Sequence, residues 1–204
     1  MRIILSTRNP TKAEQIRDIF KGSSIEVVTL TDVGIDGESK EDGETLKDNA
    51  LKKALFAYER SDDWTMADDT GVFIDSLNGL PGVRTSRWAG DNATTEETMA
   101  YTLKRLLGKN DRTAKFMTVV ALVSPSGEEH FFTGEIRGKI LDAPKTRPQP
   151  KMPYSPIFMP DGTGKVWAEM TVEEENAISH RGQAFRRAKA FLESLAEGQT
   201  ASSA

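Results

Sequence analysis

Two adjacent carboxylates, Asp68 and Asp69, are the residues of this sequence whose types are best suited to chemistry. They follow residues 64–67, which are predicted to form a strand that runs into the polar string Asp-Asp-Thr-Gly. Because successive strand residues point to opposite faces, the two carboxylates should do different jobs, one facing a metal or a water and the other holding the loop. Catalytic carboxylates often lie at the carboxyl ends of α/β strands. The alternative is that the string is simply a turn.

A second polar segment, residues 7–12, joins a predicted strand to a predicted helix and contains Thr7, Arg8, Asn9 and Lys12. A helix N-terminus offers backbone N–H groups and the positive end of a dipole, which favour a phosphate. Lys12 adds a full positive charge. The alternative interpretation is an ordinary strand-to-helix turn in which Asn9 caps the helix and Lys12 is exposed.

The third candidate is Glu41, in an acidic run ahead of a predicted helix that bears Asn49 and Lys53. Asn49 and Lys53 are four residues apart and therefore share a helix face. A carboxylate beside a basic helix face can hold Mg²⁺ against phosphate oxygens, because hard cations take oxygen ligands. Charge runs are more often merely solvated, and that alternative stays open here.

The fourth candidate is the pair His180 and Arg181, at the start of the last predicted helix. The planar fork of Arg181 suits it to acceptors on a base or a phosphate. The alternative is a surface pair that caps a helix.

Alternating strands and helices must position these residues. Strands are predicted at residues 3–5, 25–30, 64–67, 116–123 and 130–136, the last two forming a hairpin. Helices are predicted to begin at Asn9, Thr45, Thr94 and Ser179, the third with a buried stripe that includes Leu106 and Leu107. Residues 143–156 are rich in proline and predict a loop. The pattern indicates an α/β fold with a mixed sheet.

Composition narrows the function classes. The 204 residues with 37% hydrophobic content predict a single domain over 1–197, followed by a small polar tail over 198–204 that is expected to be disordered. A net charge of -4 offers no global basic surface, so we expect no nucleic-acid partner. The absence of cysteine and of a long apolar stretch predicts a cytoplasmic protein without a membrane partner.

Taken together and in this order, the four sites resemble the inosine triphosphate pyrophosphatase family, also called XTP/dITP diphosphatases. The similarity covers nearly the whole chain. The matching strings are Thr7-x-Asn9-x-x-Lys12, Glu41-x-Gly43-x-Thr45, Asn49-Ala50-x-x-Lys53-Ala54, Ala67-Asp68-Asp69-Thr70-Gly71, Leu80-Pro81-Gly82-Val83, Ser86-Arg87-Trp88-Ala89-Gly90 and Asn176-Ala177-Ile178-Ser179-His180-Arg181-Gly182.

The resemblance implies an elongated mixed sheet with two lobes around a substrate cleft, a homodimer, and hydrolysis of an aberrant purine nucleoside triphosphate between its α- and β-phosphates. It further implies that Glu41 and Asp69 hold Mg²⁺ and that Asp69 accepts the proton of the attacking water. We place Asp68 with the metal residues and Thr70 with the substrate residues.

For the substrate itself, the resemblance implies that residues 7–12 hold the triphosphate and that Lys53 adds charge nearby. His180 and Arg181 would then read the six-position of the purine. No covalent nucleophile is needed for this chemistry, which depends on charge neutralisation and an aligned water.

The sequence departs from the family pattern on the base side. The family's Phe-Gly-Tyr-Asp-Pro corresponds here to residues 152–156, with Met152, Tyr154 and Ser155 as the substrate candidates. Glu175 stands where the family commonly has lysine. Since the metal and triphosphate residues are intact, we expect retained hydrolysis with altered base selection, for a base that carries an amino group near the changed edge.

Two other classes of protein stay open. The changed loop is compatible with a nucleotide-binding module without turnover. Asp68 and Asp69 also suggest a phosphatase with an aspartyl nucleophile, although that chemistry needs two aspartates on one face, separated by one residue.

Overall fold

The computed structural model describes residues 1–201, with side chains described to residue 196. The contacts divide the chain into two compact units, where the sequence predicts one domain over 1–197. Unit 1 comprises Met1–Asp69, Thr118–Gly134 and the chain from Arg181 onward. Unit 2 comprises Thr70–Met117 and Glu135–His180. Each unit is described by itself below.

Seven strands form one mixed sheet in the order β2-β1-β3-β5-β6-β7, with β4 paired to β3. Strand β1 is parallel to both β2 and β3, whereas β3–β4 and β6–β7 are antiparallel. The mixed sheet with flanking helices confirms the predicted α/β class. The strands are β1 (Arg2–Leu5), β2 (Glu26–Thr29), β3 (Trp64–Ile74), β4 (Pro81–Gly82), β5 (Thr113–Val123), β6 (Glu129–Ile140) and β7 (Phe158–Pro160).

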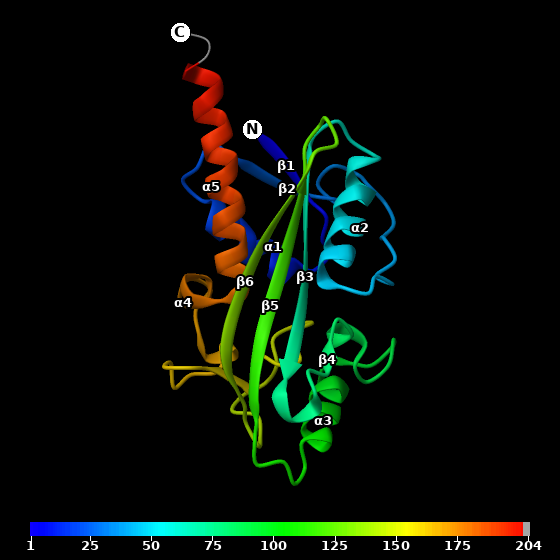
Figure 1. Ribbon diagram of the computed structural model, residues 1–204, viewed down its shortest axis with the longest axis vertical. Helices are drawn as coiled ribbons and strands as arrows, with labels where there is room; N and C mark the ends of the chain where they lie inside the picture. The colour runs from blue at the N-terminus through cyan, green and yellow to red at the C-terminus, as the bar shows by residue number, and fades with distance from the viewer. Residues whose placement is uncertain (202–204) are drawn as a thin grey trace. The chain divides into compact units, whose positions relative to one another are not determined.

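Alternating side chains of β1 build a core on each face of the sheet in unit 1. Ile3 and Leu5 are buried in a cluster with Ile16 and Phe185, from helices α1 (Pro10–Phe20) and α5 (His180–Ala201). Ile4, which points the other way, is buried with Ala57 of helix α2 (Leu46–Tyr58). Figure 1 shows α1 and α5 on one side of the strands and α2 on the other.

Side-chain caps fix where the helices of unit 1 begin. The Asn9 side chain accepts hydrogen bonds from the backbone N–H groups of Thr11 and Lys12, and Pro10 occupies the first helical position. Thr45 and Asp48 form the predicted capping box at the start of α2. Both helix starts expected from the sequence are therefore confirmed.

Strand β3 is longer than the sequence predicts, and Asp68 and Asp69 lie in its middle, not at its end. The pairing of β3 with β1 ends at Met66, because β1 stops at Leu5. Beyond that point β3 continues and pairs with β4 through Val72. The expectation of a strand end at Ala67 was wrong, because β-forming residues resume after the polar string. The two carboxylates nevertheless lie just past the carboxyl end of the neighbouring strand.

Unit 2 contains helices α3 (Thr95–Arg105) and α4 (Val172–Ile178). Helix α3 begins at the predicted Thr94, which forms a capping box with Glu97. The helix ends at Arg105, so Leu107 falls outside its register and is 76% exposed, and its predicted burial was wrong. Helix α4 and strands β4 and β7 are not predicted by the sequence, because each is short. The core of unit 2 consists of Val72, Ile74, Leu77, Leu106, Ala114, Phe116, Ile140, Tyr154, Ile157, Phe158 and Trp167.

The predicted hairpin is present, whereas part of the tail that was predicted to be disordered is helical. The hairpin of β5 and β6 is present and longer than predicted. Helix α5 continues through residues 198–201, within the tail predicted to be disordered, and residues 202–204 lie outside the described residues. Among the residues the structure describes, no helix combines the length and apolar character needed to cross a bilayer.

We predict that Phe185→Ala lowers the free energy of unfolding by about 3–5 kcal/mol, because it empties a fully buried site between α5 and the sheet. Leu107→Ala is the matched control, since that side chain is mostly exposed, and it should leave stability within error. Urea unfolding of both variants measures the difference. Equal destabilisation by the two changes would contradict this description of the core.

Candidate functional site

Strand β3 directs Asp68 and Asp69 to different partners. Asp68 Oδ2 accepts a hydrogen bond from the Lys12 ammonium at 2.9 Å. Asp69 Oδ2 accepts one from the Asn49 side-chain amide at 3.1 Å, and its Oδ1 lies 3.4 Å from Lys53 Nζ. Because Lys12 belongs to α1 while Asn49 and Lys53 belong to α2, the two carboxylates take their hydrogen bonds from different helices. The prediction that they face different groups is confirmed, and the arrangement does not fit an aspartyl phosphatase.

Asp68 lies at the centre of a buried group of charges, the Asp68 group, in which it is 2% exposed. Besides Lys12, the guanidinium of Arg181 approaches, with Nε 3.9 Å from Asp68 Oδ2. Arg181 also donates a hydrogen bond of 2.5 Å to the side chain of Gln15, one turn beyond Lys12 on α1. A single carboxylate thus holds two cations from the first and last helices of unit 1.

The pKa values in the Asp68 group reflect this crowding. Burial opposes ionisation of Asp68, but the charges of Lys12, Arg181 and Lys53 outweigh it and hold the pKa of this carboxyl well below its usual range. Burial lowers the pKa of Lys12; Asp68 opposes this, and the charges of Lys53 and Arg181 add to it. The cations around Asp68 therefore favour its ionised form despite its burial.

Glu41, Lys53, Asp69 and Asn49 form a second group, the Asp69 group. Lys53 Nζ lies 3.0 Å from Glu41 Oε1 and 3.4 Å from Asp69 Oδ1, so two carboxylates converge on one ammonium. Asn49 is buried and donates to the second oxygen of Asp69. The acidic run that carries Glu41 is therefore not merely solvated, because this residue reaches the helix face that the sequence singles out.

The pKa values of Asp69 and Lys53 both shift upward. Burial raises the pKa of Asp69; Lys53 opposes this rise and the Glu41 carboxylate adds to it, so the balance lies above the ordinary value. Burial lowers the pKa of Lys53, but the carboxylates of Asp69, Asp68 and Glu41 outweigh it and raise it. An aspartate with a raised pKa is better suited to accept a proton than an ordinary one.

The carboxylate oxygens of the Asp69 group are suited to bind a magnesium ion. Two carboxylates already gather around a cationic nitrogen, so their oxygens face the same region. Among the described residues there is no cluster of three or more His, Cys, Asp or Glu suited to a metal. Mg²⁺ is commonly bound by one or two carboxylates together with water and substrate phosphates, so a pair suffices.

In the turn before α1, Asn9 caps the helix as the ordinary-turn alternative expects, but Lys12 pairs with buried Asp68 and is not the exposed lysine of that alternative. Asn9 uses its side-chain oxygen to cap the N–H groups of Thr11 and Lys12. The Thr7 hydroxyl accepts a hydrogen bond from the Asn9 N–H at 3.2 Å. The Lys12 side chain keeps 19% of its surface exposed while it pairs with Asp68.

Arg8 turns toward the acidic loop. Its guanidinium donates to the carbonyl oxygens of Ile35 and Gly37 and lies 3.5 Å from Glu38. The residue predicted to contact substrate thus also ties the turn after β1 to the segment that leads to Glu41.

His180 is buried in unit 2 at the start of α5. Its ring stacks on Phe116, with centroids 4.8 Å apart, and lies 6.1 Å from the Trp167 ring. The exposed surface pair considered from the sequence is therefore wrong, because both His180 and Arg181 are buried.

The proline-rich loop of unit 2 is closed by Ser155. The Ser155 hydroxyl donates to the Met152 carbonyl at 2.8 Å and accepts from the Gln149 N–H at 2.9 Å. Tyr154 is buried against Phe116, with ring centroids 5.9 Å apart, whereas Met152 is partly exposed. Of the three substrate candidates in this loop, Ser155 and Tyr154 are therefore engaged within unit 2.

Glu175 and Thr70 complete the predicted residues of unit 2. Glu175 lies in α4 and is buried, which is unusual for a carboxylate. Thr70 follows Asp69 in β3 and is partly exposed.

Sequence reasoning missed one residue of the site, Gln15, and did not foresee the contact made by another, Asn49. Gln15 was not considered, although its spacing of three from Lys12 places both on one face of α1. Asn49 was recognised only as a neighbour of Lys53 on a helix face, because nothing in its type reveals that it contacts Asp69. Both residues are uncharged and fully buried.

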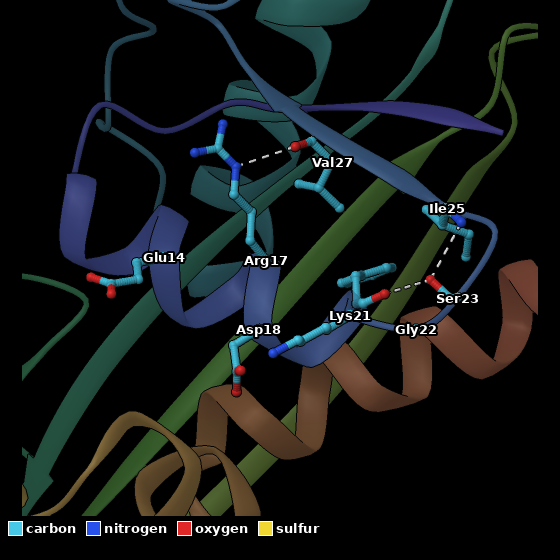
Figure 2. A pocket seen from close by; sticks show the side chains of 9 residues that line it. Glu14, Arg17, Asp18, Lys21, Gly22, Ser23, Ile25 and Val27 are labelled. Atoms are coloured by element: carbon cyan, nitrogen blue, oxygen red, sulfur yellow. Dashed lines mark hydrogen bonds between the residues drawn. The ribbon is translucent and has the colours of Figure 1, made fainter.

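A pocket elsewhere in unit 1 contains none of the predicted site residues. It lies between the C-terminal half of α1 and β2, as Figure 2 shows. Arg17, which lines it, donates to the Val27 carbonyl and pairs with Asp32, so its charge is already compensated. We therefore assign no function to this pocket.

Residues 3–191 match the model of the Ham1 family. The chain is 43% identical over 194 residues to a dITP/XTP pyrophosphatase of Thermoanaerobacter sp. (strain X514), which covers 94% of this chain and 96% of the relative.

Solved structures give the same result. The Ham1 protein of Coxiella burnetii is similar with a TM-score of 0.83 and 32% identity, over 95% of this chain and 99% of that one. The Staphylococcus aureus Ham1 protein follows with a TM-score of 0.81 and 30% identity, also over 95% and 99% of the two chains.

We predict that Asp68→Asn destabilises the protein by about 3–5 kcal/mol, because it removes the buried carboxylate that pairs with Lys12 and lies near Arg181. Asp42→Asn is the control, since Asp42 pairs with Lys52 at the exposed surface, and it should have no measurable effect. Thermal and urea unfolding compare the two. An Asp68→Asn protein as stable as the wild type would contradict the role of Asp68 as a counter-charge.

Proposed function

The chain belongs to the Ham1 family, and we propose that it hydrolyses aberrant purine nucleoside triphosphates of the ITP, dITP and XTP type to the monophosphate and pyrophosphate. The reaction would require Mg²⁺. The observation that carries the proposal is the convergence of Glu41 and Asp69 on one cationic centre, with Lys12 close by on α1. Relatives named dITP/XTP pyrophosphatase support the substrate class.

Glu41 and Asp69 would hold the metal, which supplies charge neutralisation for the phosphate oxygens. Asp69 would accept the proton of the attacking water, for which its raised pKa is favourable. Lys53, which pairs with both carboxylates here, would direct its charge to the triphosphate when those carboxylates hold a metal. Asp68 was predicted as a metal ligand; we propose instead that it holds Lys12.

The remaining contacts are proposed residue by residue. Lys12 would bind phosphate oxygens, and Thr7, Arg8 and Asn9 would shape the turn that presents it. Arg181 would contribute the planar donor fork of the Asp68 group.

In unit 2 we propose that His180 recognises the purine base. Met152 would pack against the base in place of the family's Phe. Thr70, Tyr154, Ser155 and Glu175 stay predicted substrate residues. Ser155 and Tyr154 would act by shaping the loop, since their side chains are engaged there.

Two further expectations extend the proposal. The family resemblance favours a homodimer, which sedimentation or light scattering measures. A cytoplasmic location stays a prediction from the sequence.

We predict that the protein with Mg²⁺ releases pyrophosphate, and not orthophosphate, from ITP or XTP. Chelation of the metal should abolish the release, and Asp69→Asn should lower kcat by about 10²–10⁴-fold, because the variant loses the proton acceptor and a metal ligand. A panel of purine and pyrimidine triphosphates, with separate assays for the two products, provides the measurement.

Two other results of this panel would indicate other functions. Tight nucleotide binding without turnover would overturn the proposal in favour of a binding module. Orthophosphate release would favour a phosphatase, which the different hydrogen-bond partners of Asp68 and Asp69 oppose.

A shifted base preference is the second candidate, favoured by the buried carboxylate of Glu175 in place of lysine. We predict that Ser155→Asp with Glu175→Lys changes the order of kcat/KM among the purine triphosphates by about tenfold or more. The single changes test the two positions separately: Ser155→Asp loses the hydrogen bond to the Met152 carbonyl, whereas Glu175→Lys reverses the charge at a buried position of α4. An unchanged order in the double variant and both single variants would refute the shift.

A further inference from the structure

The buried side chain of Asn49 joins the two halves of the proposed metal site. Its amide oxygen accepts a hydrogen bond from the Gly43 N–H at 2.8 Å, and its amide nitrogen donates to Asp69 Oδ2 at 3.1 Å. Asn49 itself is only 1% exposed. One amide therefore contacts both the acidic loop, two residues after Glu41, and the carboxylate of Asp69 on β3.

The hydrogen bond to Gly43 determines which atom of the Asn49 amide faces Asp69. A backbone N–H can only donate, so the atom of Asn49 that faces Gly43 must be the oxygen. The amide nitrogen is then the atom that faces Asp69, where it donates to a carboxylate. The hydrogen bond to Gly43 fixes the orientation of the Asn49 amide. The amide nitrogen therefore restricts the orientation of the Asp69 carboxylate, and with it the direction of Oδ1 toward Lys53.

Gly43 supports this arrangement from the loop. A Cβ at this position would lie 2.7 Å from Asn49 Oδ1 and 2.7 Å from Asp48 Cβ, distances that real side chains do not tolerate. The glycine thus permits the close approach of the loop to α2. The loop is also tied at the surface by the pair of Asp42 and Lys52, with 2.6 Å between the charged atoms.

We propose that Asn49 is a positioning residue, which sets the orientation of Asp69 and holds the Glu41 loop at the same time, so that both carboxylates are in place before a metal or substrate arrives. The proposal rests on the proposed function for its catalytic consequence. Its structural content, the two hydrogen bonds of Asn49, can be measured without turnover.

Two substitutions separate the two hydrogen bonds. Asn49→Asp keeps an oxygen that can accept from Gly43 N–H, but it replaces the donor to Asp69 by a second carboxylate. Asn49→Ala removes both hydrogen bonds. Lys52→Ala is the matched control, because Lys52 lies on the same helix and ties the same loop but makes no contact with Asp69.

We expect kcat to fall about ten- to hundredfold in Asn49→Ala, and at least as far in Asn49→Asp, with the KM for nucleotide changed by less than about threefold. The Gly43 amide proton, followed by NMR hydrogen exchange, should lose protection in Asn49→Ala and keep it in Asn49→Asp. Lys52→Ala should retain both kcat and protection. Thermal unfolding of each variant ensures that all measurements are made on folded protein.

Wild-type kcat in Asn49→Asp, or full protection of Gly43 in Asn49→Ala, would overturn the proposal. A wild-type protein that turns over no triphosphate would instead defeat the proposed function. In that case NMR of the Asn49 side-chain amide still tests the positioning role. Its chemical shifts should change in Asp69→Asn if the hydrogen bond exists, and unchanged shifts would reject the role.

Discussion

Two buried carboxylates on neighbouring residues of β3 require compensating charges, and the helices of unit 1 supply them. Asp68 and Asp69 are 2% and 7% exposed, so their charges receive little help from water. A buried charge is tolerated only when it is paired and hydrogen-bonded. Strand geometry sends the two side chains to opposite faces, and each face therefore needs its own cation. Lys12 and Arg181 serve one carboxylate and Lys53 the other.

This constraint explains why three helices of unit 1 meet the same strand. Helix α1 brings Lys12, the start of α5 brings Arg181, and α2 brings both Lys53 and Asn49. Caps set the first residue of α1 and α2, which fixes the distance of each cation from its helix start. The acidic loop is then fastened by Arg8 at one end and by Asn49 near Glu41. Charge pairing and backbone capping thus act on the same few segments.

The sequence predicts the parts of this arrangement that depend on local chemistry. Asn9 with Pro10, and Thr45 with Asp48, specify helix starts through contacts within a few residues, and both are present. The opposite orientation of Asp68 and Asp69 follows from strand periodicity alone and is confirmed by their contacts.

Features that depend on distant segments were not predictable. The polar string after Ala67 is typical of a turn, but it stays extended within β3, which lies between β1 and β5 in the sheet and pairs with β4 beyond the string. Leu107 has the spacing of a buried helical residue, but the helix ends before it. The hydrogen bonds of Asn49 join residues 6 and 20 positions away, so no local pattern indicates them. The family resemblance assigned residues to a site, whereas the structure shows the contacts that hold them there.

The changed loop of unit 2 shows how the structure separates two substitutions that the sequence presents together. Ser155 uses its hydroxyl as donor to the Met152 carbonyl and as acceptor from the Gln149 N–H. An ionised aspartate has no proton to donate, so it would repel that carbonyl. Lys151 adopts a positive φ of 59°, a conformation that favours glycine, and the bonds of Ser155 close the loop around it. Ser155 is thus explained by the backbone of a loop without glycine. Glu175, buried in α4, has no such explanation from the loop, and the proposed shift of base preference rests chiefly on it.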